Sequence, residues 1–573
     1  ASMTSLVPPR PERDSSGAYN FTTVKQPAVG SRGVVTSNHP LASMAGTELL
    51  LAGGNAVDAA VGTMFALSVV EPMMTTIFGA GFTNIHMADG RDVVIDNYSE
   101  VPLAATPDLF EPLPNHPEHG VVDELNWTGH LAVGVGGTCL GWATAIEKYG
   151  NLPLSDVVAP AIRLARSGFR VSPYLRQSII NAEEGLRRFA DSRSVFLPND
   201  VIPDIDDVIQ RTDYSNTLEA VGRLGANYLY GGPLGKAIAD DMAANGGLIT
   251  EEEIAAYKIY ERPPVRGSIG GGYEILAPPP PSSGGVHIIQ MMKILNQFDM
   301  AGMGFGSVDT IHLAAEALKI AFADRTEFMA DPKTTAIPIE WLTSDDYAKD
   351  RASEIDQNSS QVYNFGLQPA PEHNETTTCC AMDSEGNVVA STNTLHGAFG
   401  SKVTVPGTGM LLNNTMELMD PRPNRTNSIA PGKRILSSMS PVIVLRDGQT
   451  SFTLGSVGGL RIFGTVHQAI TNVIIHRMSL QQAIEAPRLF DQGLGLEIEK
   501  SFPDVERSLE KLTLRGHSAS SLFKVGGGMN GIYRDPVTGA MEGAACWRAD
   551  GAPVAYSGGD ALVEPDEKLG VGD

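Results

Sequence analysis

The stretch that decides the fold reads TTTCCAMDSEGNVVASTNTL and spans residues 376–395. Two arms rich in Thr, Val and Cys flank the turn-forming residues 383–387 (DSEGN), and this pattern predicts a β-hairpin. The preceding residues 357–373 (QNSSQVYNFGLQPAPEH) are polar and typical of a loop, which makes them the strongest candidate boundary in the chain. A long loop therefore meets a strand at Thr376.

Helical segments dominate the chain before this hairpin, and β-segments mixed with helices follow it. Apolar residues at helical spacing predict helices at 37–54, 55–72, most of 155–260, 287–298 and 310–328, with one further hairpin at 82–98. Residues 278–285 (PPPPSSGG) predict a rigid turn, because proline fixes φ. After the central hairpin, β-segments at 402–405, 440–455, 528–535 and 539–548 alternate with helices around 465–478 and 480–486.

Composition is that of a globular protein and excludes several classes of partner. The chain has 573 residues, of which 42% are hydrophobic and 19% charged, so it can bury a large core. Its 42 Lys and Arg against 66 Asp and Glu give a net charge of −24, which repels nucleic acid and anionic membranes. The longest nearly apolar run, residues 59–70, is too short to span a bilayer.

Cysteine usage and the N-terminus bear on the compartment. Four cysteines are too few for a disulfide scaffold in a chain of this length, so we expect reduced thiols. Residues 1–20 form a polar, Pro-rich segment that predicts a flexible tail without the apolar core of a signal peptide, and the two residues before Met3 look like an expression scar. We therefore expect a cytoplasmic protein, unless a leader was removed.

Common catalytic motifs give no alternative site. The sequence holds no Walker A loop, HExxH zinc motif, CxxC pair or GxSxG motif. What remains is the loop-to-strand junction at Thr376. A Thr released there as a new N-terminus would carry both a nucleophile and a base, since an α-amine with a pKa of about 8 can accept the hydroxyl proton. From spacing alone, a Thr run at a strand start equally fits β-propensity.

Motifs along nearly the whole chain resemble the γ-glutamyltransferase family. They include NHPLAS at 38–43, GGNAVDAAV at 53–61, PPPPSSGGVHIIQ at 278–290, the central hairpin, GMLLNN at 409–414, GKRILSSMSP at 432–441 and GSVGGLRI at 455–462. The resemblance implies an α+β fold, the four-layer αββα sandwich of the N-terminal-nucleophile hydrolases. It further implies a precursor that cuts itself between Glu375 and Thr376 into a large subunit, residues 21–375, and a small subunit, residues 376–573, which interleave as one structural unit.

The resemblance also assigns the catalytic residues. Thr376 matches the nucleophile that forms an acyl-enzyme, and Thr394 matches the Thr that orients it. Gly458 and Gly459 match the pair whose backbone N–H groups form the oxyanion hole, where a Cβ would obstruct close approach.

The acyl pocket departs from the family pattern. The family holds the α-carboxylate and α-ammonium of a γ-glutamyl group with an Arg, an Asp, an Asn or Gln and two Ser. Here Tyr98 stands at the Arg position and Leu418 at the Asp position, while Ser437 and Ser438 keep the two serines. Thr415 takes the place of the amide or a similar polar group, and His396 stands where an Asn is common. Because both counter-charges are lost, we expect a free γ-glutamyl group to bind poorly.

Two other groups of residues could supply the missing counter-charges. Glu417 is a shifted carboxylate, but in an extended segment its side chain would face away from that of Leu418. The loop cations Arg422, Arg425, Lys433 and Arg434 either form a new anion site or are simply solvated. The short stretch 418–433 also predicts an open cleft.

The sequence therefore predicts an autoprocessed amidohydrolase that cleaves a small-molecule amide through an ester at Thr376, without a metal or organic cofactor. Its altered pocket resembles the amidohydrolase and acylase branches of the family. The first alternative is a true γ-glutamyl hydrolase or transpeptidase acting on glutathione-like compounds. The second is a non-catalytic family member.

Overall fold

The computed structural model describes residues 21–114, 119–364 and 375–557. The predicted tail at 1–20 and most of the boundary loop, residues 365–374, lie outside these ranges. Within them, no helix combines the length and the apolar character needed to cross a membrane.

The central hairpin forms as predicted. Strands β10 (Glu375–Asp383) and β11 (Val388–His396) pair antiparallel, and the Asp383 carboxylate closes the turn by accepting the backbone N–H groups of Glu385 and Asn387, both at 3.0 Å. The register shifts between Glu375 and Thr377, because two residues of β11, Thr394 and Leu395, lie opposite the single residue Thr376, which places a bulge in β11 beside Thr376. Bulges of this kind concentrate beside active sites because they re-aim a side chain.

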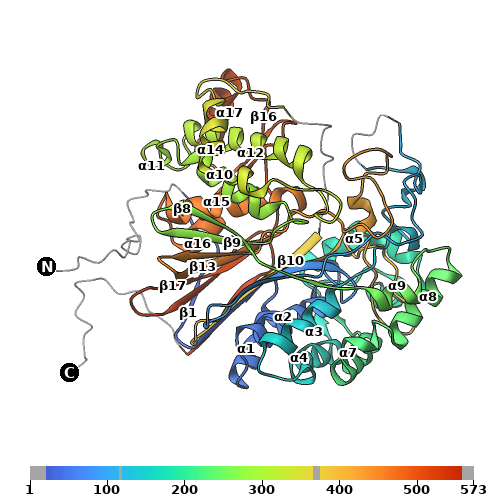
Figure 1. Cartoon of the computed structure of the whole chain (residues 1–573). Helices are drawn as coiled ribbons and strands as arrows, with labels where there is room; N and C mark the ends of the chain where they lie inside the picture. The colour runs from blue at the N-terminus through green and yellow to red at the C-terminus, as the bar shows by residue number, and fades with distance from the viewer. Residues whose placement is uncertain (1–20, 115–118, 365–374, 558–573) are drawn as a thin grey trace, which may run out of the picture.

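Two antiparallel sheets build the middle of the molecule (Figure 1). In the described ranges each sheet has seven strands, and the hairpin lies in the centre of one of them. That sheet runs in the order β19 (Ala552–Tyr556), β2 (Gly33–Ser37), β10, β11, β3 (Ala80–His86), β4 (Asp92–Asp96), β7 (Tyr260–Arg262). The other runs β1 (Ala28–Gly30), β18 (Met541–Ala545), β17 (Met529–Arg534), β13 (Gln449–Ser456), β12 (Val442–Arg446), β9 (Tyr273–Ala277), β8 (Val265–Gly270).

The sheets face each other through a buried apolar layer. Cys380, Met382, Ile443 and Ile532 belong to this layer. The neighbouring Cys379 instead joins the core on the helical side of the sheet, because successive side chains of a strand point to opposite faces. All four cysteines lie in the described ranges, and all are buried and unpaired.

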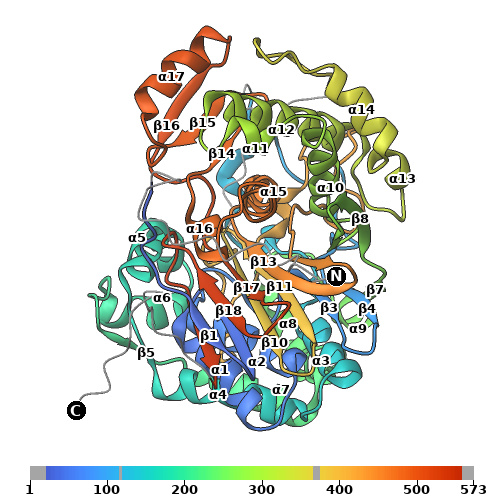
Figure 2. The same ribbon diagram turned by 90° about the vertical axis from the view of Figure 1, so that its left-hand side faces the viewer.

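Helices cover both outer faces and complete the predicted four layers (Figures 1 and 2). Under the hairpin sheet lie α1 (Pro40–Leu51) and α2 (Ala56–Val70), and every residue of α2 is buried. Asn55 caps α2 through a capping box with Asp58. The further helices on this side are α3 (Thr138–Tyr149), α4 (Leu154–Ser167), α5 (Pro173–Arg187), α6 (Ala190–Phe196), α7 (Thr212–Leu224), α8 (Pro233–Ala244) and α9 (Glu251–Ala256).

The opposite outer layer packs on the second sheet. Helices α10 (Gly284–Leu295) and α15 (Ile462–Ile474) contact its strands, and α12 (Val308–Phe328) packs on α10. The same half holds α11 (Met300–Met303), α13 (Ile339–Leu342), α14 (Asp345–Ser353), α16 (Leu480–Glu485) and α17 (Val505–Leu514), with the small sheet β14 (Leu489–Phe490), β15 (Leu496–Glu499), β16 (Ala519–Leu522). A short pair, β5 (Phe169–Arg170) and β6 (Val208–Ile209), lies in the α4–α7 region.

One predicted strand is wrong. Residues 402–405 form no strand, and Thr404 makes only an isolated bridge to Leu411. Phe399 and Lys402 both have left-handed backbone, with φ of 59° and 65°, so the chain turns here instead of extending.

A buried carboxyl joins α2 to the strand that carries Thr376. Glu71 follows the last residue of α2 and is 1% exposed, and its Oε1 accepts the Thr377 hydroxyl at 2.5 Å. Burial raises the pKa of Glu71 from 4.5 to about 8, a shift that the Thr377 hydrogen bond opposes and that the charges of Asp550 and Glu375 support.

Glu71→Gln should flatten the pH dependence of stability between about pH 5 and pH 8. The folded protein keeps the Glu71 proton in this window and the unfolded chain loses it, so this group's contribution is full below pH 4.5 and is lost as pH rises through about 8. The slope from one such group is up to about 1.4 kcal/mol per pH unit. Calorimetric Tm values at several pH values should fall less steeply in the variant; equal slopes would contradict the assignment.

Candidate active site

The structure gathers eight of the ten predicted site residues in one pocket. It is lined by Tyr98, Thr376, Thr394, His396, Leu418, Ser437, Ser438 and Gly459, together with Leu436, Met439 and Ile462. These residues come from the ends of both hairpin strands, from the segment that follows β4, from the 3-10 helix Thr415–Leu418, from the segment 436–439, and from the turn that leads into α15. Segments far apart in sequence therefore meet around Thr376.

The Thr394 hydroxyl makes three hydrogen bonds at the centre of the pocket. It accepts the Thr376 hydroxyl at 3.3 Å and the His396 backbone N–H at 2.7 Å, and it donates its single proton to the backbone carbonyl of Glu375. A Thr hydroxyl has one donor and two acceptor sites, so Thr394 is saturated. Thr394 thus links the Thr376 hydroxyl to the carbonyl of the peptide group between Glu375 and Thr376, and its hydrogen bond polarises that carbonyl.

His396 follows Thr394 closely and has a strained backbone. Its φ is 86°, in the left-handed region, and such a conformation costs on the order of 1–3 kcal/mol in a non-glycine residue. Its imidazole Nε2 lies 2.5 Å from the Glu417 carboxylate, and its ring packs edge-on against Trp127 at 5.7 Å between centroids. These contacts hold the strained residue in place.

The expectation that Glu417 lies in an extended segment and faces away from Leu418 is wrong. Residues Thr415–Leu418 form a 3-10 helix and not an extended segment, so the side chains of Glu417 and Leu418 need not face opposite ways. Leu418 lines the pocket, while the Glu417 carboxylate contacts the imidazole of the pocket residue His396. Glu417 is therefore a site residue that sequence analysis underrated, because four residues of 3-10 helix leave no periodic signal.

Thr415 and Gly458 lie next to the pocket without lining it. The Thr415 hydroxyl is buried in hydrogen bonds with Ser99 at 2.8 Å and Asn413 at 2.9 Å. The predicted substrate role of Thr415 stays a prediction.

The glycine pair forms a tight turn at the start of α15. Gly458 and Gly459 have φ of 123° and 59°, and a Cβ on Gly458 would lie 2.9 Å from the Gly526 Cα. Among the described residues, neither backbone N–H of the pair has a hydrogen-bond acceptor. Unpaired N–H groups at a helix start are suited to an anionic oxygen.

The serine pair is held by the proline-rich turn. The Ser437 N–H donates to the Pro281 carbonyl at 3.0 Å, and the Ser437 carbonyl accepts the Ser283 N–H at 2.8 Å. The Ser438 hydroxyl is buried without a hydrogen-bond partner in the described part of the chain, and Ser438 lines the pocket. Its predicted role in binding substrate stays a prediction.

The loop cations make no anion site in this pocket. Arg422 and Arg425 pair with Asp420 at 2.9 and 3.8 Å, and Lys433 donates to backbone carbonyls. Arg434 is fully buried between Asp96 and Glu100, at 3.2 and 2.5 Å. Of the described residues, no Lys or Arg lines the pocket.

Comparison with known proteins settles the family. The sequence model described as Gamma-glutamyltranspeptidase matches residues 42–556. The chain belongs to the gamma-glutamyltranspeptidase family. It is 48% identical over 542 residues to the "Acylase ACY 1 proenzyme" of Pseudomonas sp. (strain SE83), covering 94% of this chain and 96% of that protein. It is 39% identical over 505 residues to the "Glutathione hydrolase proenzyme" of Escherichia coli (strain K12), covering 85% and 86%.

Solved structures agree with this result. The cephalosporin acylase from Bacillus halodurans superposes with a TM-score of 0.84 at 27% identity, over 94% of this chain and 99% of that one. The predicted fold is therefore confirmed. This protein is an autoprocessed amidohydrolase of the N-terminal-nucleophile class.

Thr376→Ala should leave one uncut chain, because it removes the hydroxyl that Thr394 links to the Glu375 carbonyl. Thr376→Ser keeps that hydroxyl and is the matched control, so it should still cleave itself between residues 375 and 376. Intact mass under denaturing conditions distinguishes one species from two that meet between residues 375 and 376. Two fragments from Thr376→Ala would contradict the assignment.

Proposed function

We propose that Thr376 is the nucleophile of an acylase whose acyl group carries no α-ammonium. In the precursor, the Thr376 oxygen attacks the Glu375 carbonyl carbon, the Glu375–Thr376 C–N bond breaks, and the proton passes to the Thr376 nitrogen. Water then hydrolyses the resulting ester, which frees the Glu375 carboxylate and an N-terminal Thr376. This step makes the α-amine that serves as base.

Turnover repeats the same chemistry on a substrate. The α-amine accepts the Thr376 hydroxyl proton while the oxygen attacks the amide carbonyl, and the N–H groups of Gly458 and Gly459 receive the developing oxyanion. The substrate amine leaves with the proton, and an acyl ester on Thr376 remains. Water, or an accepting amine, then releases the acyl group.

The observation that carries the proposal is the apolar wall beside Thr376. Leu418 stands in the pocket where the resemblance expects a carboxylate, and it is 5% exposed. An ammonium placed against it would lose its water without gaining a counter-charge. The 48% identity to the acylase proenzyme supports the same assignment.

A carboxylate on the acyl group still has partners. Ser437 and Ser438 both line the pocket, and the Ser438 hydroxyl has no hydrogen-bond partner among the described residues. These donors are weaker than a bidentate guanidinium. The preferred acyl group is therefore a carboxylate-bearing chain such as glutaryl, or a neutral one of similar length.

The γ-glutamyl alternative has one observation in its favour. The Glu417 carboxylate contacts a pocket residue, although His396 already occupies one of its oxygens. The non-catalytic alternative is disfavoured by the bonded set of Thr376, Thr394 and Glu375, which a binding protein would not need. The cytoplasmic location expected from the sequence stays a prediction.

Three p-nitroanilides of nearly equal length test the acyl preference. L-γ-Glutamyl, glutaryl and butyryl anilides differ by successive removal of the ammonium and the carboxylate. We expect kcat/KM for the glutaryl anilide to exceed that for the γ-glutamyl anilide at least about tenfold, because an unpaired buried polar or charged group costs on the order of 1–3 kcal/mol. A preference for the γ-glutamyl anilide would support the glutathione-type alternative.

Leu418→Asp should improve γ-glutamyl turnover, because it restores a carboxylate on the pocket wall. Leu418→Asn is the control of similar shape without charge. We expect kcat/KM for the γ-glutamyl anilide to rise about tenfold in Leu418→Asp and not in Leu418→Asn. Equal values in both variants would show that residue 418 does not face the substrate ammonium.

A further inference from the structure

We propose that Arg488, Glu499 and Arg548 are positioning residues for the Gly458–Gly459 turn, acting through the loop 525–528. The inference rests on the proposed oxyanion role of the two glycines. It adds a buried ion network, distant in sequence, on which the geometry of that turn depends.

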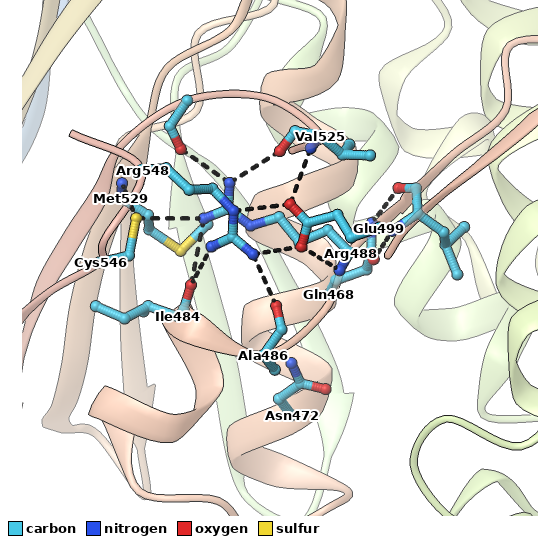
Figure 3. A network of polar contacts seen from close by, with 12 residues as sticks. Gln468, Asn472, Ile484, Ala486, Arg488, Glu499, Val525, Met529, Cys546 and Arg548 are labelled. Carbon is cyan, nitrogen blue, oxygen red and sulfur yellow. Dashed lines mark hydrogen bonds and ion pairs between the residues drawn. The ribbon is translucent and has the colours of Figure 1, made fainter. Parts of the chain in front are cut away.

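Glu499 is the centre of the network (Figure 3). It is fully buried, and its carboxylate accepts Arg548 Nε at 2.8 Å, with a second contact to Arg548 Nη2. The same carboxylate accepts the backbone N–H groups of Arg488 and Val525, both at 2.8 Å. One buried charge thereby fixes the start of the loop 525–528.

Arg488 holds the same loop from its carbonyl side. Its Nη1 donates to the carbonyls of Val525 and Gly527 at 3.1 and 2.8 Å, and its Nη2 donates to that of Ile484 at 3.3 Å. The guanidinium is planar, so its donors reach two loop carbonyls and one helix carbonyl in a fixed geometry. Arg488 is 3% exposed, so little water competes for these bonds.

The loop is in turn bonded to the residue before the glycine pair. The Gly527 N–H donates to the Val457 carbonyl at 2.9 Å, and the Val457 N–H donates to the Gly528 carbonyl at 3.2 Å. Gly458 packs so closely on the loop that a Cβ would lie 2.9 Å from the Gly526 Cα. The path from Glu499 to Gly458 is therefore a continuous set of short contacts.

The loop needs such support because its own sequence is permissive. Residues 526–528 are three consecutive glycines, which have no side chain to fix their conformation. An oxyanion hole works only when its donors stand about 3 Å from the developing charge, and small displacements cost rate steeply. Anchoring from outside supplies the rigidity that glycine cannot.

The network should affect turnover and not self-cleavage. In the uncut chain the Glu375 carbonyl accepts the Thr394 hydroxyl, and no hydrogen bond joins it to Gly458 or Gly459 in the described residues. Moving the glycine turn should therefore leave processing intact while it slows catalysis on a substrate. A merely structural network would not separate the two.

Arg488→Lys tests the proposal, with Arg211→Lys as its matched control. Arg211 is also 3% exposed and also donates to three backbone carbonyls, those of Ser68, Val69 and Gly409, none of which lines the pocket. Both variants should lose a similar amount of free energy of unfolding. Both should still cleave themselves between residues 375 and 376. The readout is hydrolysis of p-nitrophenyl acetate per cleaved small subunit, because an acetyl group makes little demand on the acyl pocket.

We expect kcat of Arg488→Lys to fall at least about tenfold with KM within about twofold, and kcat of Arg211→Lys to stay near the wild-type value. Equal kcat in both variants, or a change confined to KM, would overturn the proposal. Wild-type protein without Thr376-dependent ester hydrolysis would overturn the proposed function and this inference with it, before any variant is compared.

Gly526→Ala decides the matter if Arg488→Lys does not fold. An added Cβ there meets its nearest atom at 3.4 Å, so it fits, but φ of +70° strains an alanine and shifts the loop. A processed variant with reduced kcat and unchanged KM supports the proposal. A processed variant with wild-type kcat overturns it.

Discussion

The hydroxyl of Thr394 makes the contacts on which the geometry of the active site depends. It receives the Thr376 hydroxyl and the His396 amide, and it gives its proton to the Glu375 carbonyl. This pairing needs the strands β10 and β11 in fixed register, with the β11 bulge opposite Thr376. The register is fixed in turn because the hairpin is buried in the centre of a sheet whose two faces pack against helices and a second sheet. The site is thus a local consequence of the whole sandwich.

Local patterns predicted the hairpin, the buried helix α2 and most of the other helices, since periodicity and turn residues act over short distances. The resemblance supplied the positions that converge on Thr376, including Tyr98 and Leu418. What sequence reasoning missed depends on geometry without a periodic signal. Glu417 was underrated because the 3-10 turn at Thr415–Leu418 was expected to be extended, and Lys402 lies in a turn where a strand was predicted.

Buried charge was the hardest feature to predict. Arg434 resembled a solvated loop residue or part of an anion site, yet it is fully buried between two carboxylates. Arg548 bonds Glu499 across 49 residues of sequence, and nothing in either local stretch indicates the pairing. Such groups remain charged inside a protein only when partners surround them.

The mass of the protein during turnover shows directly whether Thr376 is the nucleophile. Wild-type protein would be mixed with glutaryl p-nitroanilide or p-nitrophenyl acetate, and the reaction would be quenched in acid. The protein would then be digested into peptides for mass analysis. We expect the chain to be cut between Glu375 and Thr376 and the small subunit to carry one acyl group on Thr376. An acyl group on any other residue, or turnover by an uncut chain, would contradict this expectation.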